Sequence, residues 1–216
     1  MVIVGAGGFA KEILQTFSQR NALKDLFFFD NISKNPPTKL FDRFPILRTL
    51  DEVQDVFRKT SDNRFTLGLG RPLARYKLNN MFSSIGGLLT STISPYAEVG
   101  SFGTTLDAGC NILSGAVITN NVVIGKGCLI NPFCSVSHDS VLGDYVELAP
   151  GVRITGNCAI GSFSVLGTNA VVIPGIKIGS NVVVGAGAVV TKDIPDNVMV
   201  VGVPAIVKKQ LAPLDI

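Results

Sequence analysis

Residues 129–151 read LINPFCSVSHDSVLGDYVELAPG, and an aliphatic residue stands at every sixth position of this stretch. These positions are Ile130, Val136, Leu142 and Leu148. The spacing continues without exception over fifteen positions, from Leu106 to Val190, and Ile93 and Val99 extend it upstream after a slip of one residue. A period of six drifts around a helix of 3.6 residues per turn, so an amphipathic helix cannot produce it. We therefore predict short strands joined by tight turns and stacked into a parallel β-helix.

Small residues accompany the aliphatic series. The aliphatic side chain is expected to point into the coil, and the residue four positions later is expected to fit a cramped corner. Alanine or serine often occupies this corner, and cysteine occupies it four times. These cysteines are Cys110, Cys128, Cys134 and Cys158. We interpret them as small buried residues, so they indicate neither a disulfide framework nor a metal site.

Residues 1–90 lack the six-residue period. Strand, glycine turn and helix are predicted over residues 2–17, and a second strand lies within 25–31. A helix is predicted over 47–57, and a further strand, glycine and helix over 64–82. This order indicates a short βαβαβ unit with helices over a parallel sheet.

The turn after the first strand carries Gly5, Gly7 and Gly8, which would let backbone amides approach a phosphate at a helix N-terminus. Asp30, at the end of the next strand, is placed to bind a ribose hydroxyl. A tight turn without any ligand is the alternative interpretation. An NAD site is disfavoured because about 90 residues hold only half of a dinucleotide-binding fold. A single nucleotide, or a nucleotide joined to a sugar, fits better.

The composition narrows the class of protein. A chain of 216 residues, 16% charged and 46% hydrophobic, can bury a real core and does not read as disordered. The net charge of +3 is weak evidence for a nucleic-acid partner. Apolar runs fall short of the ~18 residues that span a bilayer, and the apolar start lacks the basic region and cleavage site of a signal peptide. We expect a cytoplasmic protein without a membrane span.

Six motifs together resemble one family of enzymes. They are VGAGGFAKE at 4–12, FFFDN at 27–31, GLGRPLARYK at 68–77, SHDSVLGDYVELAPG at 137–151, GNCAIG at 156–161 and GAGAVVTKDIPDN at 185–197. With them the chain resembles, over essentially its whole length, the hexapeptide-repeat nucleotide-sugar acetyltransferases. These include the bacillosamine-pathway UDP-4-amino-sugar enzymes, GDP-perosamine N-acetyltransferase and sialic-acid O-acetyltransferase-like proteins. The resemblance implies a Rossmann-like nucleotide-sugar-binding α/β domain at 1–90, a left-handed β-helix acyltransferase domain at 91–207 and a tail at 208–216.

The resemblance also implies a set of site residues. His138 matches the family's catalytic histidine, Asp139 matches the acidic residue that supports it, and Gly156 matches the glycine whose amide faces the thioester oxygen. Contacts with the co-substrate acetyl-CoA are expected at Glu147, Gly156, Thr168 and Ala186. Among these, Glu147 stands where many relatives carry a second histidine that helps to bind the cofactor. Sugar-nucleotide contacts are expected at Gly7, Gly8, Phe9, Asp30, Asn31, Gly70 and Arg71.

His138 is the only histidine in the chain, and its position suits catalysis. It follows the inward Val136 by two residues, so its side chain should leave the coil. A plain surface histidine is the alternative, and a zinc site of the kind that other β-helix enzymes build needs three histidines. An imidazole, with a reference pKa of ~6.5, suits a general base, and Asp139 could stabilise the imidazolium. The substrate then supplies the nucleophile, and the Gly156 amide would stabilise the oxyanion.

One outward histidine per chain implies a site completed by a neighbouring coil, and the family forms trimers with sites between subunits. Valines before the inward aliphatic positions are expected to form one apolar stripe for this packing. They are Val117, Val123, Val141, Val165, Val171, Val183 and Val189. The predicted function is acetyl-CoA-dependent N-acetylation of a nucleotide-linked amino sugar in bacterial glycan synthesis, without a metal. The alternatives are O-acetylation of a sugar of the sialic-acid type and a non-catalytic nucleotide-sugar-binding β-helix.

Overall fold

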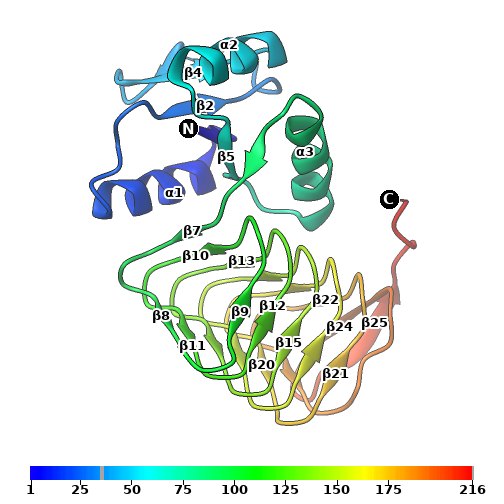
Figure 1. The fold of residues 1–216 in the computed structure, drawn as a ribbon. Coiled ribbons are helices and arrows are strands. Elements are labelled where there is room, and N and C mark those ends of the chain that lie inside the picture. Colours follow the sequence, from blue (N-terminus) through cyan, green and yellow to red (C-terminus); the bar gives the residue numbers. More distant parts are fainter. Residues whose placement is uncertain (35–36, 216) are drawn as a thin grey trace.

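The computed structural model describes residues 1–34 and 37–215. An α/β part contains the elements from β1 to β6, and a three-sided coil of stacked strands follows it (Figure 1). The expected α/β domain followed by a parallel β-helix is therefore confirmed. Within the described residues, each helix is too short or too polar to cross a membrane.

The α/β part is a three-layer unit. Its elements are β1 (Val2–Val4), α1 (Gly8–Gln19), β2 (Phe27–Phe29), β3 (Lys39–Leu40), β4 (Phe44–Leu47), α2 (Leu50–Thr60), β5 (Arg64–Leu67), α3 (Pro72–Ser84) and β6 (Leu88–Leu89). The sheet has the order β3-β4-β2-β1-β5-β6 and is parallel except between β3 and β4. Ile3 and Phe28 pack with α1 on one side, while Val4 and Phe29 pack with α2 and α3 on the other.

The strands β3, β4 and β6 of this sheet were not predicted, and one helix starts later than predicted. β3 has only two residues, and β4 contains Pro45, whose missing N–H argues against a strand. The helix expected over 47–57 begins at Leu50 because Thr49 accepts a hydrogen bond from the Glu52 amide while the Glu52 carboxylate accepts from the Thr49 amide. This capping box fixes the helix start.

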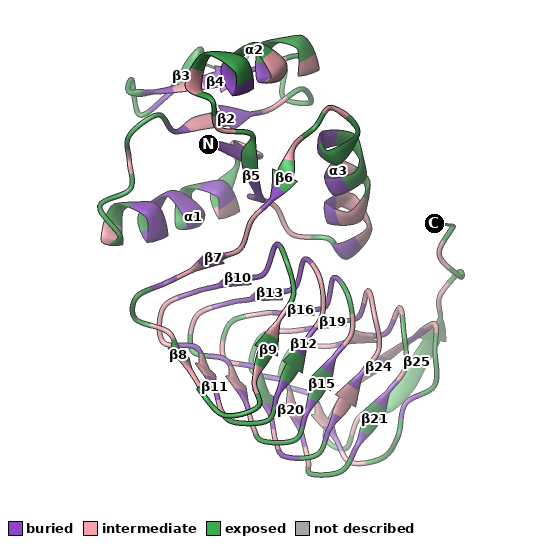
Figure 2. Cartoon of the chain, in the orientation of Figure 1, coloured by how far each residue is buried: buried purple, intermediate pink, exposed green. Residues whose placement is uncertain are grey.

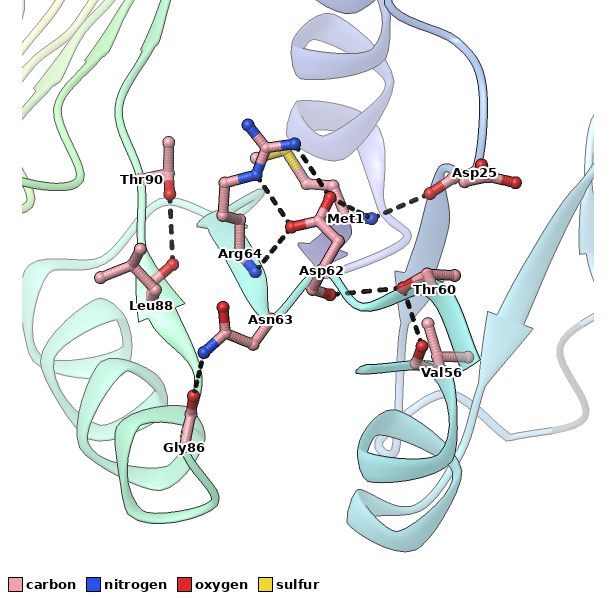
Figure 3. A network of polar contacts seen from close by, with 10 residues as sticks. All are labelled: Met1, Asp25, Val56, Thr60, Asp62, Asn63, Arg64, Gly86, Leu88 and Thr90. Atoms are coloured by element: carbon pink, nitrogen blue, oxygen red, sulfur yellow. Dashed lines mark hydrogen bonds and ion pairs between the residues drawn. The ribbon is translucent and has the colours of Figure 1, made fainter. Parts of the chain in front are cut away.

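A polar network connects the start of β5 to the start of β1 (Figure 3). The Asp62 carboxylate accepts from Arg64 Nε at 2.8 Å and pairs with the Met1 amine at 3.3 Å. The Met1 amine also donates to the carbonyl of Asp25 at 2.9 Å. The Arg64 guanidinium, together with the Met1 amine, holds the pKa of Asp62 well below its usual range. This network closes the end of the sheet that lies opposite the glycine turns.

The coil has three faces. Face 1 consists of β7 (Thr92–Ile93), β10 (Asn111–Ile112), β13 (Leu129–Ile130), β16 (Glu147–Leu148), β19 (Val165–Leu166), β22 (Val183–Val184), β24 (Val198–Val201) and β25 (Ile206–Gln210). Face 2 consists of β8 (Glu98–Val99), β11 (Val117–Ile118), β14 (Ser135–Val136), β17 (Arg153–Ile154), β20 (Val171–Val172) and β23 (Val189–Val190). Face 3 consists of β9 (Thr105–Leu106), β12 (Val123–Ile124), β15 (Val141–Leu142), β18 (Ala159–Ile160) and β21 (Lys177–Ile178).

The six-residue period sets the interior of the coil. Each aliphatic position is the second residue of a strand, and all those from Ile112 to Val190 are buried. The four cysteines are buried and unpaired, as predicted, and burial raises the pKa of Cys110 to about 12. The upstream slip is one extra residue between β8 and β9. The corners repeatedly place a residue in the left-handed backbone region, including Asp139 at φ 60°.

The α/β part stands on face 1, over β7, β10 and β13 (Figure 2). The amide of Asn111 donates to the carbonyl of Leu67 at 2.7 Å and accepts from the Thr66 hydroxyl at 3.0 Å. Leu113 and Tyr145, which belong to the coil, join the two hydrophobic cores of the α/β part. The two parts therefore share buried polar and apolar contacts.

The valines do not form one stripe, so that prediction is wrong. Val165 and Val183 lie on face 1; Val117, Val171 and Val189 on face 2; Val123 and Val141 on face 3. A step of six residues carries the chain to the next face, so successive outward valines turn around the coil. The most exposed are Val123 and Val141, at 44% and 45%, and they are register partners on face 3.

The coil ends with β25, which pairs antiparallel with β24. The tail expected at 208–216 thus begins inside β25, and residue 216 lies outside the described residues.

Candidate active site

A hollow of about 620 Å³ opens where β1, β2 and β5 end. Its lining includes every residue that was expected to contact a sugar nucleotide. These are Gly7, Gly8, Phe9, Asp30, Asn31, Gly70 and Arg71. In open parallel sheets, ligands bind outside the carboxyl ends of the strands, which is where this hollow lies.

The glycines of the hollow divide into two kinds. A Cβ at Gly5 would lie 2.7 Å from the Gly68 carbonyl oxygen, and one at Gly68 would lie 2.7 Å from Ile3, so these two glycines are needed for packing. A Cβ at Gly7 or Gly8 would meet no atom within 4 Å. The fold itself therefore does not require glycine at Gly7 and Gly8, whereas a ligand lying against the backbone would.

Helix α1 begins at this point with its amides exposed to the hollow. Its N-cap is Gly7, which has no side chain to cap the helix, and the first turn carries no acidic residue. The first-turn amides and the positive end of the helix dipole therefore favour an anion such as a phosphate.

Asp30 also lines the hollow, directly after β2. Its Oδ1 atom accepts from the amides of Ile32 at 3.0 Å and Ser33 at 3.1 Å. Burial acts to raise the pKa of Asp30, but hydrogen bonds from Ser33 and Ile32 outweigh it, so the pKa lies below its ordinary value. The carboxylate is therefore charged at neutral pH and can accept hydrogen bonds from hydroxyl groups.

His138 lies on the edge of the coil between face 2 and face 3. Its side chain is 63% exposed, as the outward orientation predicted, and its Nδ1 atom lies 2.7 Å from Oδ2 of Asp139. The amide of Asn121, one coil turn earlier, donates to the other oxygen of Asp139. Hydrogen bonds from Asn121 and His138 hold the pKa of Asp139 below its ordinary value. A charged carboxylate thus orients the ring and leaves Nε2 turned away from it.

Gly156 lies one coil turn after His138, on the same edge. A Cβ there would lie 2.6 Å from Cε1 and 2.7 Å from Nε2 of the imidazole. The ring therefore rests against the Gly156 backbone, and a larger residue would displace it. The structure brings together His138, Asp139 and Gly156, as expected.

The remaining expected residues lie elsewhere on the coil. Thr168 and Ala186 are exposed on the edge between face 1 and face 2, one coil turn apart. Glu147 lies on face 1, where it contacts the α/β part. The described lining of the 620 Å³ hollow does not include His138. Within a single chain, the hollow and the histidine are therefore separate sites.

Two residues near these groups were missed from the sequence. Asn121 is an ordinary corner residue until the coil closes, because only the coil pitch brings it to Asp139. Arg75 lies in a helix with an irregular pattern, yet its side chain is fully buried and paired with Glu147 at 2.7 Å. Neither residue carried a local signal, although the separation of 18 residues between Asn121 and Asp139 becomes meaningful once the length of a coil turn is known. Across the described part of the chain, no group of three or more His, Cys, Asp or Glu side chains is placed to hold a metal ion.

Both parts of the chain are similar to known proteins. Residues 121–156 and 157–192 match the family described as bacterial transferase hexapeptide (six repeats), and residues 1–82 match the PglD N-terminal domain. A search of curated protein sequences finds no significant match. Among solved structures, a variant of perosamine N-acetyltransferase from Caulobacter crescentus, in complex with CoA and GDP-perosamine, is 30% identical with a TM-score of 0.87. The similarity covers 97% of this chain and 96% of that one.

The chain belongs to the hexapeptide-repeat acetyltransferases. Two further members of this family show the same architecture. The acetyltransferase domain of PglB from Neisseria gonorrhoeae, in complex with acetyl coenzyme A, is 28% identical, with a TM-score of 0.86 over 97% of this chain and 98% of that one. WeeI from Acinetobacter baumannii is 29% identical, with a TM-score of 0.85 over 96% and 100%. Within this hexapeptide-repeat acetyltransferase, the α/β part and the coil are therefore parts of one enzyme.

Proposed function

We propose that this enzyme transfers the acetyl group of acetyl-CoA to the amino group of a nucleotide-linked amino sugar. The hollow of the α/β part would hold the nucleotide. Its phosphates would lie at the amides of Gly7 and Gly8, at the N-terminus of α1, and Asp30 would accept hydrogen bonds from ribose hydroxyls. Arg71, at the rim, would face the same anion.

His138 would act as the general base. As the sugar amine attacks the thioester carbon, a C–N bond forms and Nε2 of His138 takes a proton from the nitrogen. The tetrahedral intermediate then collapses, the C–S bond breaks, and the imidazolium returns the proton to the thiolate of CoA. Asp139 stabilises the imidazolium in this cycle, while Asn121 holds Asp139 in place. The amide of Gly156 would stabilise the oxyanion, and Thr168 and Ala186 remain expected positions along acetyl-CoA.

The site would be completed by a second chain within a homotrimer. The described lining of the hollow lacks His138, which supports a site in which a neighbouring chain brings its own histidine to the sugar. Face 3 adjoins the His138 edge and carries the exposed pair Val123 and Val141, which supply an apolar contact for a copy of the chain. A closed ring of three chains would place three such contacts around one axis.

The observation that carries this proposal is the pairing of His138 with Asp139 in a chain that also has a glycine-lined nucleotide hollow. The relative solved with CoA and GDP-perosamine, which is similar over nearly its whole length, supports the same substrate classes. The test measures release of the CoA thiol when purified protein meets acetyl-CoA and UDP-, GDP- or dTDP-linked amino sugars. Turnover with at least one amino sugar, and none with the matching hydroxyl sugar, is expected. Turnover only with hydroxyl sugars would replace N-acetylation by O-acetylation.

A further inference from the structure

Glu147 occupies an unusual place for a residue expected to contact acetyl-CoA. Its Oε2 atom accepts from the backbone amide of Arg71 at 2.9 Å and from Nη1 of Arg75 at 2.7 Å. A Cβ at Gly70 would lie 3.2 Å from Oε1 of the same carboxylate. Glu147 is therefore in close contact with the Gly70–Arg71 segment, and its side chain is only 18% exposed.

Arg75 anchors this carboxylate from the helix side. Its side chain is fully buried, and Nε donates to the carbonyl of Gly127 at 3.1 Å. Nη2 donates to the carbonyls of Tyr145 at 2.8 Å and Val146 at 3.3 Å. Every nitrogen of the guanidinium thus bonds to the coil, so α3 is fixed to face 1 by a buried charge, and Glu147 is its ion-pair partner among the described residues.

The Arg71 backbone needs such a support. It has φ 62° and ψ 101°, which is costly for a residue with a side chain, and it precedes Pro72. Arg71 is also the N-cap of α3 and provides no side-chain cap for the helix. The Glu147 carboxylate at this end satisfies one amide and interacts favourably with the helix dipole.

Arg71 connects the Glu147 contact to the proposed nucleotide site. Gly70 and Arg71 form part of the wall of the 620 Å³ hollow, whereas Arg71 and Glu147 also line a second hollow of about 240 Å³ on face 1. Glu147 therefore acts on the nucleotide hollow from behind its wall. The contact joins the coil directly to the loop that faces the nucleotide.

We propose that Glu147 is a positioning residue that fixes the Gly70–Arg71 wall of the nucleotide hollow and so sets the affinity for the sugar nucleotide. The identity of the ligand in this role rests on the proposed function. The contact that fixes the Gly70–Arg71 wall is independent of that function. It assigns Glu147 to the nucleotide half of the site, in place of the acetyl-CoA contact expected from the sequence.

The kinetic test uses Glu147→Gln, with Glu98→Gln as the control. Glu98 is also the outward residue of a coil strand, but it lies on face 2, remote from α3. Glu147→Gln is expected to raise KM for the sugar nucleotide about tenfold, the scale of losing one charge-assisted hydrogen bond. KM for acetyl-CoA should stay within about twofold, as expected for a residue that makes no contact with it. Glu98→Gln should change neither value.

Hydrogen exchange of the peptide that covers residues 69–75 provides a readout that needs no substrate. Faster exchange there in Glu147→Gln, but not in Glu98→Gln, is the expected result. The double variant Arg75→Met with Glu147→Met leaves no unpaired buried charge and should show the same local change if the single variant folds poorly. Unchanged exchange in residues 69–75, or a raised KM for acetyl-CoA alone, would overturn the proposal. An inactive wild type with the expected exchange pattern would count against the proposed function but not against this role.

Discussion

The Nδ1 atom of His138 lies 2.7 Å from the Oδ2 atom of Asp139, although the two residues are neighbours in the sequence. Adjacent side chains on a strand point to opposite sides, so this contact requires the corner. Asp139 takes the left-handed backbone position at φ 60°, which turns its carboxylate back towards the imidazole. The hexapeptide corner thus builds the dyad from two successive residues.

Replacing His138 by Ala should lower kcat by roughly 10²–10⁴-fold, the usual effect of losing a general base. Stability should change little because the side chain is mostly exposed. Thiol release at saturating substrates measures kcat, and a thermal melt measures the stability. Near-normal turnover by a folded His138→Ala protein would remove His138 from the reaction.

Replacing Asp139 by Asn should lower kcat, because Asn cannot orient the ring of His138 with a charge or stabilise the imidazolium that forms during transfer. The charge of Asp139 is present at neutral pH because hydrogen bonds from Asn121 and His138 hold its pKa below the ordinary value. Thiol release at saturating substrates measures the loss. A kcat equal to that of the wild type would contradict a role for the pairing.

Replacing Asp30 by Ala should weaken binding of the sugar nucleotide about tenfold or more while leaving acetyl-CoA binding intact. Isothermal calorimetry with each ligand separates the two effects. Asp55→Ala is a suitable control, because Asp55 lies on the exposed side of α2, away from the hollow. Weaker acetyl-CoA binding with unchanged nucleotide binding would contradict the proposal that the α/β part binds the sugar nucleotide.

Replacing Val141 by Asp should dissociate the proposed trimer and abolish transfer together. A charge beside Val123 would have to be buried in the contact between chains, which is costly without a partner. Val171→Asp, at an outward position of face 2, should leave both the assembly and the activity intact. Light scattering and thiol release give the two readouts. A fully active monomer in the Val141→Asp protein would show that one chain holds a complete site.

The fold was predictable from the sequence because the six-residue period corresponds to one strand and one turn of a β-helix. Every inward position and every cysteine followed from it, and the residues that line the hollow followed from the ends of the strands β1, β2 and β5. The valine stripe failed because a local pattern records which residues point outward but not which face each strand joins. The contacts of Glu147 were not predictable, since Arg71 and Arg75 approach it only after the α/β part settles on face 1. Asn121 was missed for the same reason, because it meets Asp139 across a coil turn.

In the proposed trimer, the nucleotide hollow of one chain works with His138 of another. Mixed trimers test it directly, using His138→Ala chains and Gly8→Leu chains. A Cβ at Gly8 would meet no atom within 4 Å, so Gly8→Leu should fold while filling the space for the ligand.

The measurement is thiol release by a one-to-one mixture of the two inactive variants, assembled together. About one quarter of the wild-type rate is predicted, because in a random mixture half of the chains supply an intact hollow and half an intact histidine. A rate no higher than that of the two variants assayed separately would contradict the account, since each chain would then depend on its own hollow and its own His138.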